Sequence, residues 1–326
     1  FFMRVLWTHN FDPSVLSGGV FMNLLADGLR EQGVEIDLHF LGNVRSIKGI
    51  LKAREQLREV AVGYDVVHAQ FGSACSLVTT AVKDRPVVIS LRGSDWYIYR
   101  ERFNKECIHG MLAHFMSRAS LRKANHVITM SDCMTESVIR AFPGLSVSTV
   151  TDPVDLSQFK PIEKKEARAE LGFENDDRKW VLFTTLSKTN PIKRVGLAEE
   201  AVKRVNEKLG GVTIKYATGL KHEEMPCFVS ACDVILCTSV HEGWPNSIKE
   251  ALACNVPFVA TEVSDLKKIA DQEPSCRICS SNSSDIAESI VEVLDEERVD
   301  LTRHVSQMDV PVVSKQVKAL YEKLLA

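Results

Sequence analysis

Two carboxylates, Glu242 and Glu250, are separated by seven residues in the part of the chain whose residue types are best suited to chemistry. An apolar strand is predicted over 234–237 before them, and another over 257–261 after them. A helix starting near Asn246 would place Glu250 about one turn, roughly 6 Å, inside it. Glu242 would lie on the loop before that helix, so both carboxylates can face one ligand.

This order of strand, loop, helix and strand predicts acidic groups at the carboxyl end of a parallel sheet, where open α/β sheets bind ligands. Asn246 or Ser247 is the natural N-cap of the helix, and the free amides of its first turn suit an anionic or hydroxyl-rich ligand. The pattern indicates a pocket for a polyol phosphate. A second interpretation has equal weight: Glu242 and Glu250 could simply complement the helix dipole on a solvated surface.

Composition narrows the class of protein. The chain has 326 residues, enough for two domains, and 40 basic against 43 acidic residues, so no global field points to nucleic acid. No run of 18 apolar residues occurs, and the start lacks a signal-peptide pattern, which predicts a soluble, cytoplasmic protein. The nine cysteines lie mostly in apolar surroundings, which is typical of reduced thiols. Cys276 and Cys279 have CxxC spacing without a second ligand pair, so we predict no metal site.

Strands and helices alternate through the first half of the chain, which predicts a doubly wound, Rossmann-like domain. The expected strands are 3–8, 36–41, 66–69, 87–91, 127–130 and 147–150, and the expected helices are 19–32, 46–60, 74–82, 111–123 and 134–141. A turn-rich crossing with two prolines over 151–161 predicts a domain boundary, with a first domain over 1–153 and a second over 154–311.

A second set of strand and helix patterns follows the crossing. The expected strands are 180–186, 212–217, 234–237, 257–261 and 277–279, and the expected helices are 195–208, 223–231, 285–294 and 313–325. Apolar residues recur along the last of these helices at Val317, Leu320, Tyr321 and Leu324. That spacing predicts a helix with one face packed against another part of the protein.

The stretch around the two carboxylates resembles the Glu-x7-Glu segment of retaining glycosyltransferases of family 4, which have the GT-B fold. The likeness includes Glu242-Gly243, Pro245, Glu250-Ala251, Ala253-Cys254 and Pro257. Within that family, Lys249 and Asn255 resemble the branch that makes bacterial cell-surface polysaccharides of the teichuronic-acid type. The resemblance implies an α/β protein with two Rossmann-like, doubly wound domains facing across a cleft. It also implies that a final helix over 312–326 crosses back to the first domain.

The resemblance assigns donor-binding roles in the second domain. It implies that Glu250 holds the ribose hydroxyls and that Glu242 holds the donor-sugar hydroxyls, with Gly243, Asn246 and Ser247 beside them. Lys188 and Lys193 would neutralise the leaving diphosphate, and cations at a helix start are unfavourable unless an anion offsets them. Lys188 stands where the family has Arg, which keeps the charge but loses the bidentate fork. Arg194 replaces Lys193 if the register shifts by one residue.

Gly18 and Gly19 follow the first strand and precede its helix, so their backbone can approach a ligand closely. The residues alone favour an ordinary turn. The resemblance aligns both glycines with the loop that meets the donor diphosphate. They do not form the GxGxxG pattern of dinucleotide enzymes, which argues against NAD.

Arg92 ends the strand over 87–91, at the place where many relatives carry a His near the reacting carbon. It is a catalytic candidate that could bind phosphate or an acidic acceptor. His68 is a candidate acceptor contact after the third strand, with a buried, hydrogen-bonded histidine as the alternative. At the linker, Asp152-Pro153 replaces the Asn-Gly that the family usually carries.

Asp95, Trp96 and Tyr97 are further candidates for acceptor binding. The aromatic side chains that follow Asp95 are interleaved with basic ones, and such a loop could stack on sugars or meet lipid phosphates. Ordinary packing is an equal alternative for half of them. Residues 1–152 hold 17 basic and 15 acidic side chains, a net charge of +2, which is weakly consistent with peripheral contact with an anionic membrane.

Taken with the resemblance, the sequence predicts a retaining glycosyltransferase that moves a sugar from a UDP- or GDP-type donor to a saccharide or lipid-linked acceptor in polysaccharide and cell-envelope biosynthesis. No DxD metal motif and no cofactor motif is present, so a metal-independent reaction is expected. A nucleotide-sugar epimerase or a phosphorylase would use the same fold. A non-catalytic partner subunit is a third alternative, because Arg92 and Lys188 depart from the family pattern.

Overall fold

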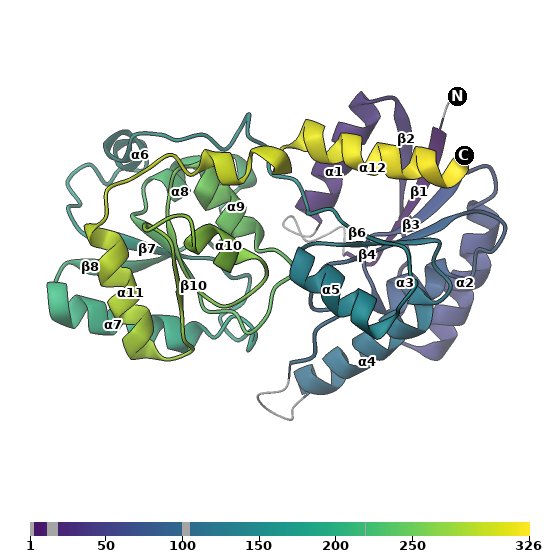
Figure 1. The fold of residues 1–326 in the computed structure, drawn as a ribbon, viewed down its shortest axis with the longest axis horizontal. Helices are drawn as coiled ribbons and strands as arrows, with labels where there is room; N and C mark the ends of the chain where they lie inside the picture. The colour runs from purple at the N-terminus through teal and green to yellow at the C-terminus, as the bar shows by residue number, and fades with distance from the viewer. Residues whose placement is uncertain (1–2, 12–18, 100–104, 219) are drawn as a thin grey trace. The chain divides into compact units, whose positions relative to one another are not determined.

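Two compact units divide the chain (Figure 1). The computed structural model describes residues 3–11, 19–99, 105–218 and 220–326. The first unit consists of the chain up to Pro153 together with His241–Trp244 and Val310–Ala326. The second unit consists of Val154–Val240 and Pro245–Asp309. Each unit is a parallel α/β sheet with helices on both faces, which confirms the predicted fold class of two Rossmann-like units.

The sheet of the first unit has six parallel strands in the order β2-β1-β3-β4-β5-β6. Its strands are β1 (Met3–His9), β2 (Val34–Phe40), β3 (Val66–Ala69), β4 (Val87–Leu91), β5 (His126–Thr129) and β6 (Val147–Thr149). Strands β3 and β4 are buried along their whole length, which explains their continuous apolar runs.

Helices cover both faces of this first sheet. They are α1 (Val20–Glu31), α2 (Ile47–Val60), α3 (Ser73–Thr79), α4 (Lys105–Leu121), α5 (Asp132–Ala141) and, from the end of the chain, α12 (Val310–Leu325). Figure 1 shows α1 and α12 side by side on one face, and the two helices are in contact. Helices α2, α3 and α5 share a hydrophobic core on the other face.

The second unit has a five-stranded parallel sheet in the order β11-β10-β9-β7-β8. Its strands are β7 (Lys179–Phe183), β8 (Val212–Tyr216), β9 (Val234–Cys237), β10 (Phe258–Thr261) and β11 (Arg277–Cys279). Its helices are α6 (Lys164–Glu170), α7 (Val195–Leu209), α8 (Met225–Ser230), α9 (Asn246–Ala253), α10 (Leu266–Ala270) and α11 (Ser283–Asp295), with short 3-10 turns at His222–Glu224, Thr302–His304 and Ser306–Met308. Helices α7 and α11 pack together on one face.

Two helix starts differ by three residues or more from the sequence-based expectation. Helix α4 begins at Lys105 rather than at 111, and α12 begins at Val310 rather than at 313. Pro311 falls in the first turn of α12, where a proline is tolerated because its missing N–H would have no partner there. The short helices α6 and α10 were not predicted.

A buried chain of hydrogen bonds fastens the last helix to the first sheet. The Trp7 indole donates to the Tyr321 hydroxyl at 2.9 Å, and that hydroxyl lies 2.6 Å from Nδ1 of His68. Nε2 of His68 lies 2.8 Å from the Ser90 hydroxyl. Since the indole can only donate, the Tyr321 O–H is free to donate to His68, whose other nitrogen then donates to Ser90. Burial lowers the pKa of His68, so its imidazole is neutral. This series of hydrogen bonds requires the neutral form, in which one ring nitrogen accepts and the other donates.

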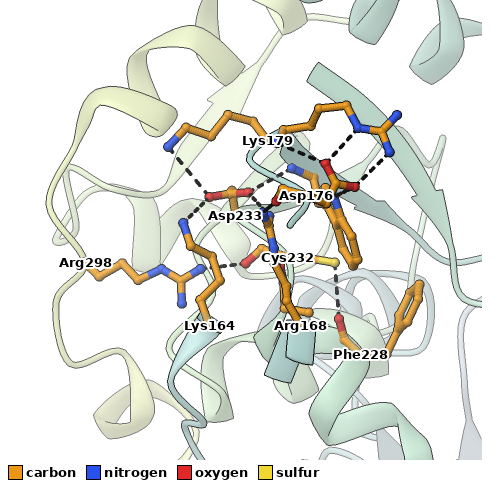
Figure 2. Close-up of polar contacts among 11 residues, drawn as sticks. Lys164, Arg168, Asp176, Lys179, Phe228, Cys232, Asp233 and Arg298 are labelled. Atoms are coloured by element: carbon orange, nitrogen blue, oxygen red, sulfur yellow. Dashed lines mark hydrogen bonds and ion pairs between the residues drawn. The ribbon is translucent and has the colours of Figure 1, made fainter. Parts of the chain in front are cut away.

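A buried ion cluster fastens α6 to the sheet of the second unit (Figure 2). The Asp233 carboxylate, just before β9, accepts hydrogen bonds from Lys164 at 2.8 Å and from Arg168 at 3.0 Å. It also accepts the backbone N–H of Trp180 at 2.8 Å. Arg298 donates to the neighbouring carbonyl of Cys232 at 2.6 Å. A single carboxylate thus joins a helix, two strands and, through its neighbour, the segment after α11.

None of the helices in the described ranges is both long and apolar enough to cross a membrane.

Candidate functional site

The strand order of the second unit defines where a ligand would bind. The chain passes from β7 to β8 on one side and then returns to place β9 on the other side of β7. In open parallel sheets, the crevice at the carboxyl ends of two such strands is the usual ligand site. The loop after β7 carries Lys188 and Lys193, and the segment after β9 leads to Glu250. The fold therefore gathers these three predicted donor residues at one edge of one sheet.

Arg194 ties the two loops together. Its Nε donates to the carbonyl of Thr238 at 2.6 Å and its Nη2 to the carbonyl of Ser239 at 3.0 Å. The Thr238 hydroxyl returns a bond of 2.6 Å to the carbonyl of Lys193. Arg194 has a left-handed backbone with φ of 50°, a conformation that costs free energy for a non-glycine residue. The hydrogen bonds of its side chain stabilise this backbone conformation. They also use its guanidinium to bind the loop after β9, whereas the role predicted for Arg194 in place of Lys193 is to bind the diphosphate.

Lys193 and Lys188 precede the first turn of α7, whose free amides carry partial positive charge. Lys188 is exposed, lies 3.9 Å from the Glu199 carboxylate, and stands 3.8 Å above the Tyr216 ring. The backbone N–H of Lys193 donates to the carbonyl of Asn190 at 3.2 Å, which shapes the turn. Both lysines therefore precede a helix start, where cations are unfavourable unless negative charge offsets them, and for Lys188 the Glu199 carboxylate supplies part of that charge.

Helix α9 begins at Asn246, so the expectation that Asn246 or Ser247 caps it is wrong. Pro245 occupies the cap position, and its carbonyl accepts the N–H of Ile248 at 3.0 Å. The Asn246 side-chain oxygen instead accepts a bond of 3.0 Å from the fully buried ammonium of Lys249. The first amides of any helix have no intrahelical partner, so the start of α9 still offers N–H groups at this edge.

Glu250 lies one turn into α9, half-buried. Burial raises the pKa of its carboxyl group to about 7, against the opposing effect of the nearby Lys249 ammonium. A carboxyl group that is this difficult to ionise, placed at a switch point, is typical of a functional site. Hydroxyl donors from a ligand would stabilise its carboxylate form.

Glu242 and Gly243 belong to the segment His241–Trp244, which groups with the first unit, whereas Glu250 belongs to the second. The two carboxylates that opened the sequence analysis are thus assigned to different units. Their joint contact with one donor stays a prediction.

The first sheet has its own switch point between β1 and β3, because the chain passes from β1 to β2 on one side before β3 pairs with the other. Gly19 caps α1 there with φ of 80°, a conformation that favours glycine. An added Cβ would lie 3.4 Å from Met22 and 3.5 Å from Phe11. Gly18, the other predicted glycine, lies outside the described residues.

Arg92 is buried at the carboxyl end of β4 and engaged by the protein itself. Its Nε donates to the Gln70 carbonyl at 2.6 Å, Nη2 donates to the Gln70 side chain at 2.8 Å, and Nη1 forms an ion pair with Asp152. The guanidinium also stacks 4.1 Å above the Phe21 ring. Arg92 and Asp152 both depart from the family pattern, and they are paired. A catalytic role for Arg92 stays a prediction.

His68 is buried, and both its ring nitrogens have partners in the chain to Tyr321 and Ser90. This arrangement is the buried, hydrogen-bonded alternative that the sequence left open. No pattern in the sequence indicates its partner Tyr321, which lies 253 residues away.

Asp95 organises the loop after β4. Its carboxylate accepts the backbone N–H groups of Gly72 at 2.7 Å and of Arg92 and Gly93 at 2.9 Å each, and burial raises the pKa of its carboxyl group. Trp96 is buried and donates to the Ser137 hydroxyl at 3.0 Å. These two predicted acceptor residues therefore shape the loop. Tyr97 is half-buried against the first core.

The cysteines of the CxxC pair are buried thiols. Burial raises the pKa of Cys276 to about 11 and that of Cys279 to about 12, so both are protonated at neutral pH. Within the described ranges, no group of three or more His, Cys, Asp and Glu side chains is arranged to hold a metal ion.

Comparison with known proteins identifies both halves. The model of Glycosyltransferase Family 4 matches residues 38–158, and a model of glycosyl transferases group 1 matches residues 190–296. The chain is 24% identical over 279 residues to TuaC of Bacillus subtilis (strain 168), described as a teichuronic acid biosynthesis glycosyltransferase. That match covers 76% of this chain and 68% of TuaC.

Solved structures with the same fold cover nearly the whole chain. Sucrose-phosphate synthase from Thermosynechococcus elongatus aligns with a TM-score of 0.74 at 15% identity over 99% of each chain. Anabaena HepE in complex with UDP and glucose aligns with a TM-score of 0.69 at 15% identity, over 98% of this chain and 100% of that one. At such identities the likeness shows the fold alone. The two family models together with this fold establish that the chain belongs to the family 4 type of glycosyltransferases with the GT-B fold.

Proposed function

We propose that this glycosyltransferase takes a sugar from a nucleoside diphosphate donor of the UDP or GDP type, retains its anomeric configuration, and needs no metal ion. The acceptor is a hydroxyl of a saccharide or a lipid-linked glycan, in the biosynthesis of a cell-envelope polysaccharide. TuaC is named for teichuronic acid biosynthesis, and HepE was solved with UDP and glucose, which supports this process and this donor class.

The observation that carries the proposal is the environment of Glu250. Its carboxyl group has a pKa raised to about 7 at the switch point of the second sheet, across the loops from Lys188 and Lys193. A ribose diphosphate has two ends with different needs. Its ribose end needs a carboxylate that accepts hydrogen bonds from two hydroxyls, and its diphosphate end needs cations. Neither set alone would select this ligand.

The chemistry then follows from those positions. The bond between the anomeric carbon and the diphosphate oxygen breaks, while Lys188, Lys193 and the first amides of α7 and α9 stabilise the negative charge on the leaving group. The acceptor hydroxyl forms the new bond on the same face of the sugar. Its proton passes to the departing phosphate oxygen, so no protein base is required at that step.

A thermal-shift screen tests the donor site. The protein is heated with UDP, GDP, CDP, ADP or dTDP, with magnesium or with EDTA, and in parallel as Glu250→Ala and Lys193→Ala. One nucleotide should raise the melting temperature equally with and without magnesium, because a ligand that binds only the folded state stabilises it. Both substitutions should abolish the rise.

Each alternative has a distinct result in this screen and in a turnover assay. A rise that requires magnesium contradicts metal independence. Epimerisation or hydrolysis of the sugar nucleotide without an acceptor would indicate an epimerase. Absence of any rise would favour a non-catalytic partner subunit and would remove the basis for the donor residues.

A further inference from the structure

Helix α4 buries two serine side chains while three of its large apolar side chains are exposed, which is unusual for a helix on a soluble domain. Its buried face carries hydroxyls: Ser117 accepts the backbone N–H of Ser73 at 2.7 Å, and Ser120 lies 2.6 Å from the hydroxyl of Ser76. These small residues let α4 pack closely on α3. The buried face of α4 therefore includes these two serines as well as Cys107 and Leu121, and it leaves several larger apolar residues of the helix outside the core.

The outer face of α4 carries those large apolar residues. Ile108, Leu112 and Phe115 are 44%, 53% and 59% exposed, and Ala119 is exposed beyond them. Their spacing of four, three and four residues places all four on one side of the helix, in a stripe roughly 17 Å long. We call these four residues the α4 stripe. Single exposed apolar residues are ordinary, but a continuous stripe on a helix marks a surface that contacts something apolar.

The charged residues at the C-terminal end of the α4 stripe are all basic. Arg122 continues the spacing of the stripe at its end, Lys123 follows it, and both are exposed. Arg118 lies half-buried beside them, with its guanidinium 4.7 Å from the Phe142 ring centre. From Cys107 to Ser131 the sequence contains no Asp or Glu. An apolar face with three cations at one end is complementary to a surface that is apolar inside and anionic outside.

We propose that the α4 stripe docks this glycosyltransferase on an anionic lipid bilayer. The helix lies along the membrane plane, Leu112 and Phe115 enter the boundary between headgroups and acyl chains, and Arg122 and Lys123 meet lipid phosphates. This inference goes beyond the proposed function and does not depend on it, since a chain that binds no donor could still dock. It also differs from the aromatic loop after Asp95, because Trp96 is buried.

A second copy of the chain fits the α4 stripe less well. Pairing two such helices would cover the apolar side chains. It would also bring Arg118, Arg122 and Lys123 and their three counterparts to one interface, although the sequence of each helix has a single carboxylate, Glu106. Anionic lipid supplies the missing negative charge, so the bilayer is the favoured occupant.

Vesicle flotation of the full chain tests the proposal. The probes are phosphatidylcholine vesicles and vesicles in which about one lipid in four is phosphatidylglycerol. Two double variants are compared with the unmodified protein: Leu112→Ser with Phe115→Ser, and Arg122→Gln with Lys123→Gln. The control is Leu209→Ser, because Leu209 is also an exposed helical leucine, 47% exposed, but ends α7 in the second unit.

The unmodified protein and the control should float with the anionic vesicles and bind neutral ones at least about tenfold more weakly. Each double variant should lose at least about tenfold in partition onto anionic vesicles while keeping its melting temperature and its nucleotide-induced shift. Equal binding to both vesicle types, or unchanged binding by both double variants, overturns the proposal. A concentration-dependent dimer that the Leu112 and Phe115 substitutions abolish, without any flotation, overturns it in favour of a second copy.

Discussion

At the level of single residues, the protonation state of Glu250 depends strongly on its buried surroundings. A carboxyl group with a pKa raised from 4.5 to about 7 binds a proton in the folded state that it has already lost in the unfolded state between those two pH values. Stability from this group is therefore present at low pH and is lost as pH rises from 4.5 through 7. Above pH 7 the folded protein carries the full cost of an ionised, desolvated carboxylate.

Replacing Glu250 with Gln removes this cost. Urea unfolding between pH 4.5 and 8 should show the Glu250→Gln variant gaining on the unmodified protein as pH rises. The difference should level off above pH 7 near 3 kcal/mol, as an order of magnitude from ~1.4 kcal/mol per unit of pKa. Comparing the two proteins at each pH cancels the titration of other groups. Parallel curves across this range would show that Glu250 ionises normally.

Lys188 offers a substitution that should strengthen donor binding. An ammonium makes single hydrogen bonds to a diphosphate, whereas a guanidinium makes paired ones. Lys188→Arg should therefore tighten the nucleoside diphosphate found in the thermal screen by about threefold to tenfold. Calorimetric titration measures this change, and Lys193→Ala, which removes a cation, should weaken the same ligand. Unchanged binding by both Lys188→Arg and Lys188→Ala would mean that Lys188 does not face the donor.

At the level of elements, the Asp233 cluster determines how firmly α6 is attached to the second sheet (Figure 2). Asp233→Asn should lower the free energy of unfolding by about 3 kcal/mol, because the buried guanidinium of Arg168 then lacks its counter-charge. Asp27→Asn is the control, since its pair with Arg30 is exposed and worth at most ~0.5 kcal/mol. Urea unfolding measures both. Equal losses would show that the cluster is no stronger than a surface pair.

The elements themselves were largely predictable from the sequence. Buried parallel strands produce short, continuous apolar runs, and helices such as α7 repeat their apolar residues every three or four positions. The five-residue helix α10 was not predicted, because a helix of about one and a half turns shows too little periodicity in its sequence to be recognised. The start of α4 was misplaced for a related reason: its apolar residues are not confined to one face.

The position of a site residue was predictable only where it follows from the sequence of strands and helices along the chain. Lys193 lies in the loop after β7 and Glu250 in the first helix after β9, so the fold class alone brings them to one edge of the sheet. The pair of Arg92 and Asp152 joins residues 60 positions apart. A long-range ion pair leaves no periodic trace, although both residues stood out as departures from the family pattern. The prediction that Asn246 caps α9 was wrong, because its side-chain oxygen accepts a hydrogen bond from Lys249 and not from the first amides of the helix.

At the level of the whole molecule, the hydroxyl of Tyr321 connects the end of the chain to its beginning. Tyr321→Phe leaves the Trp7 indole and Nδ1 of His68 buried without their partner. We expect a loss of about 1–3 kcal/mol in the free energy of unfolding, measured in urea. Tyr64→Phe is the matched control, since its hydroxyl donates to Asp37 in a part-buried pair. A loss no larger than in this control would contradict the role of the buried chain.

The contact between the last helix and the first unit also determines the order in which the protein can fold during its synthesis. Domains usually fold as the ribosome releases them, from the N-terminus onward. Here the first unit lacks α12 until Val310–Ala326 emerges, after the whole second unit has been translated. At about 5–20 residues per second, Trp7 and His68 wait tens of seconds, roughly 15–60 s, for the tyrosine that completes their core. A prematurely terminated nascent chain would therefore release an unfinished first unit, which gives quality-control proteases a way to distinguish truncated copies from complete ones.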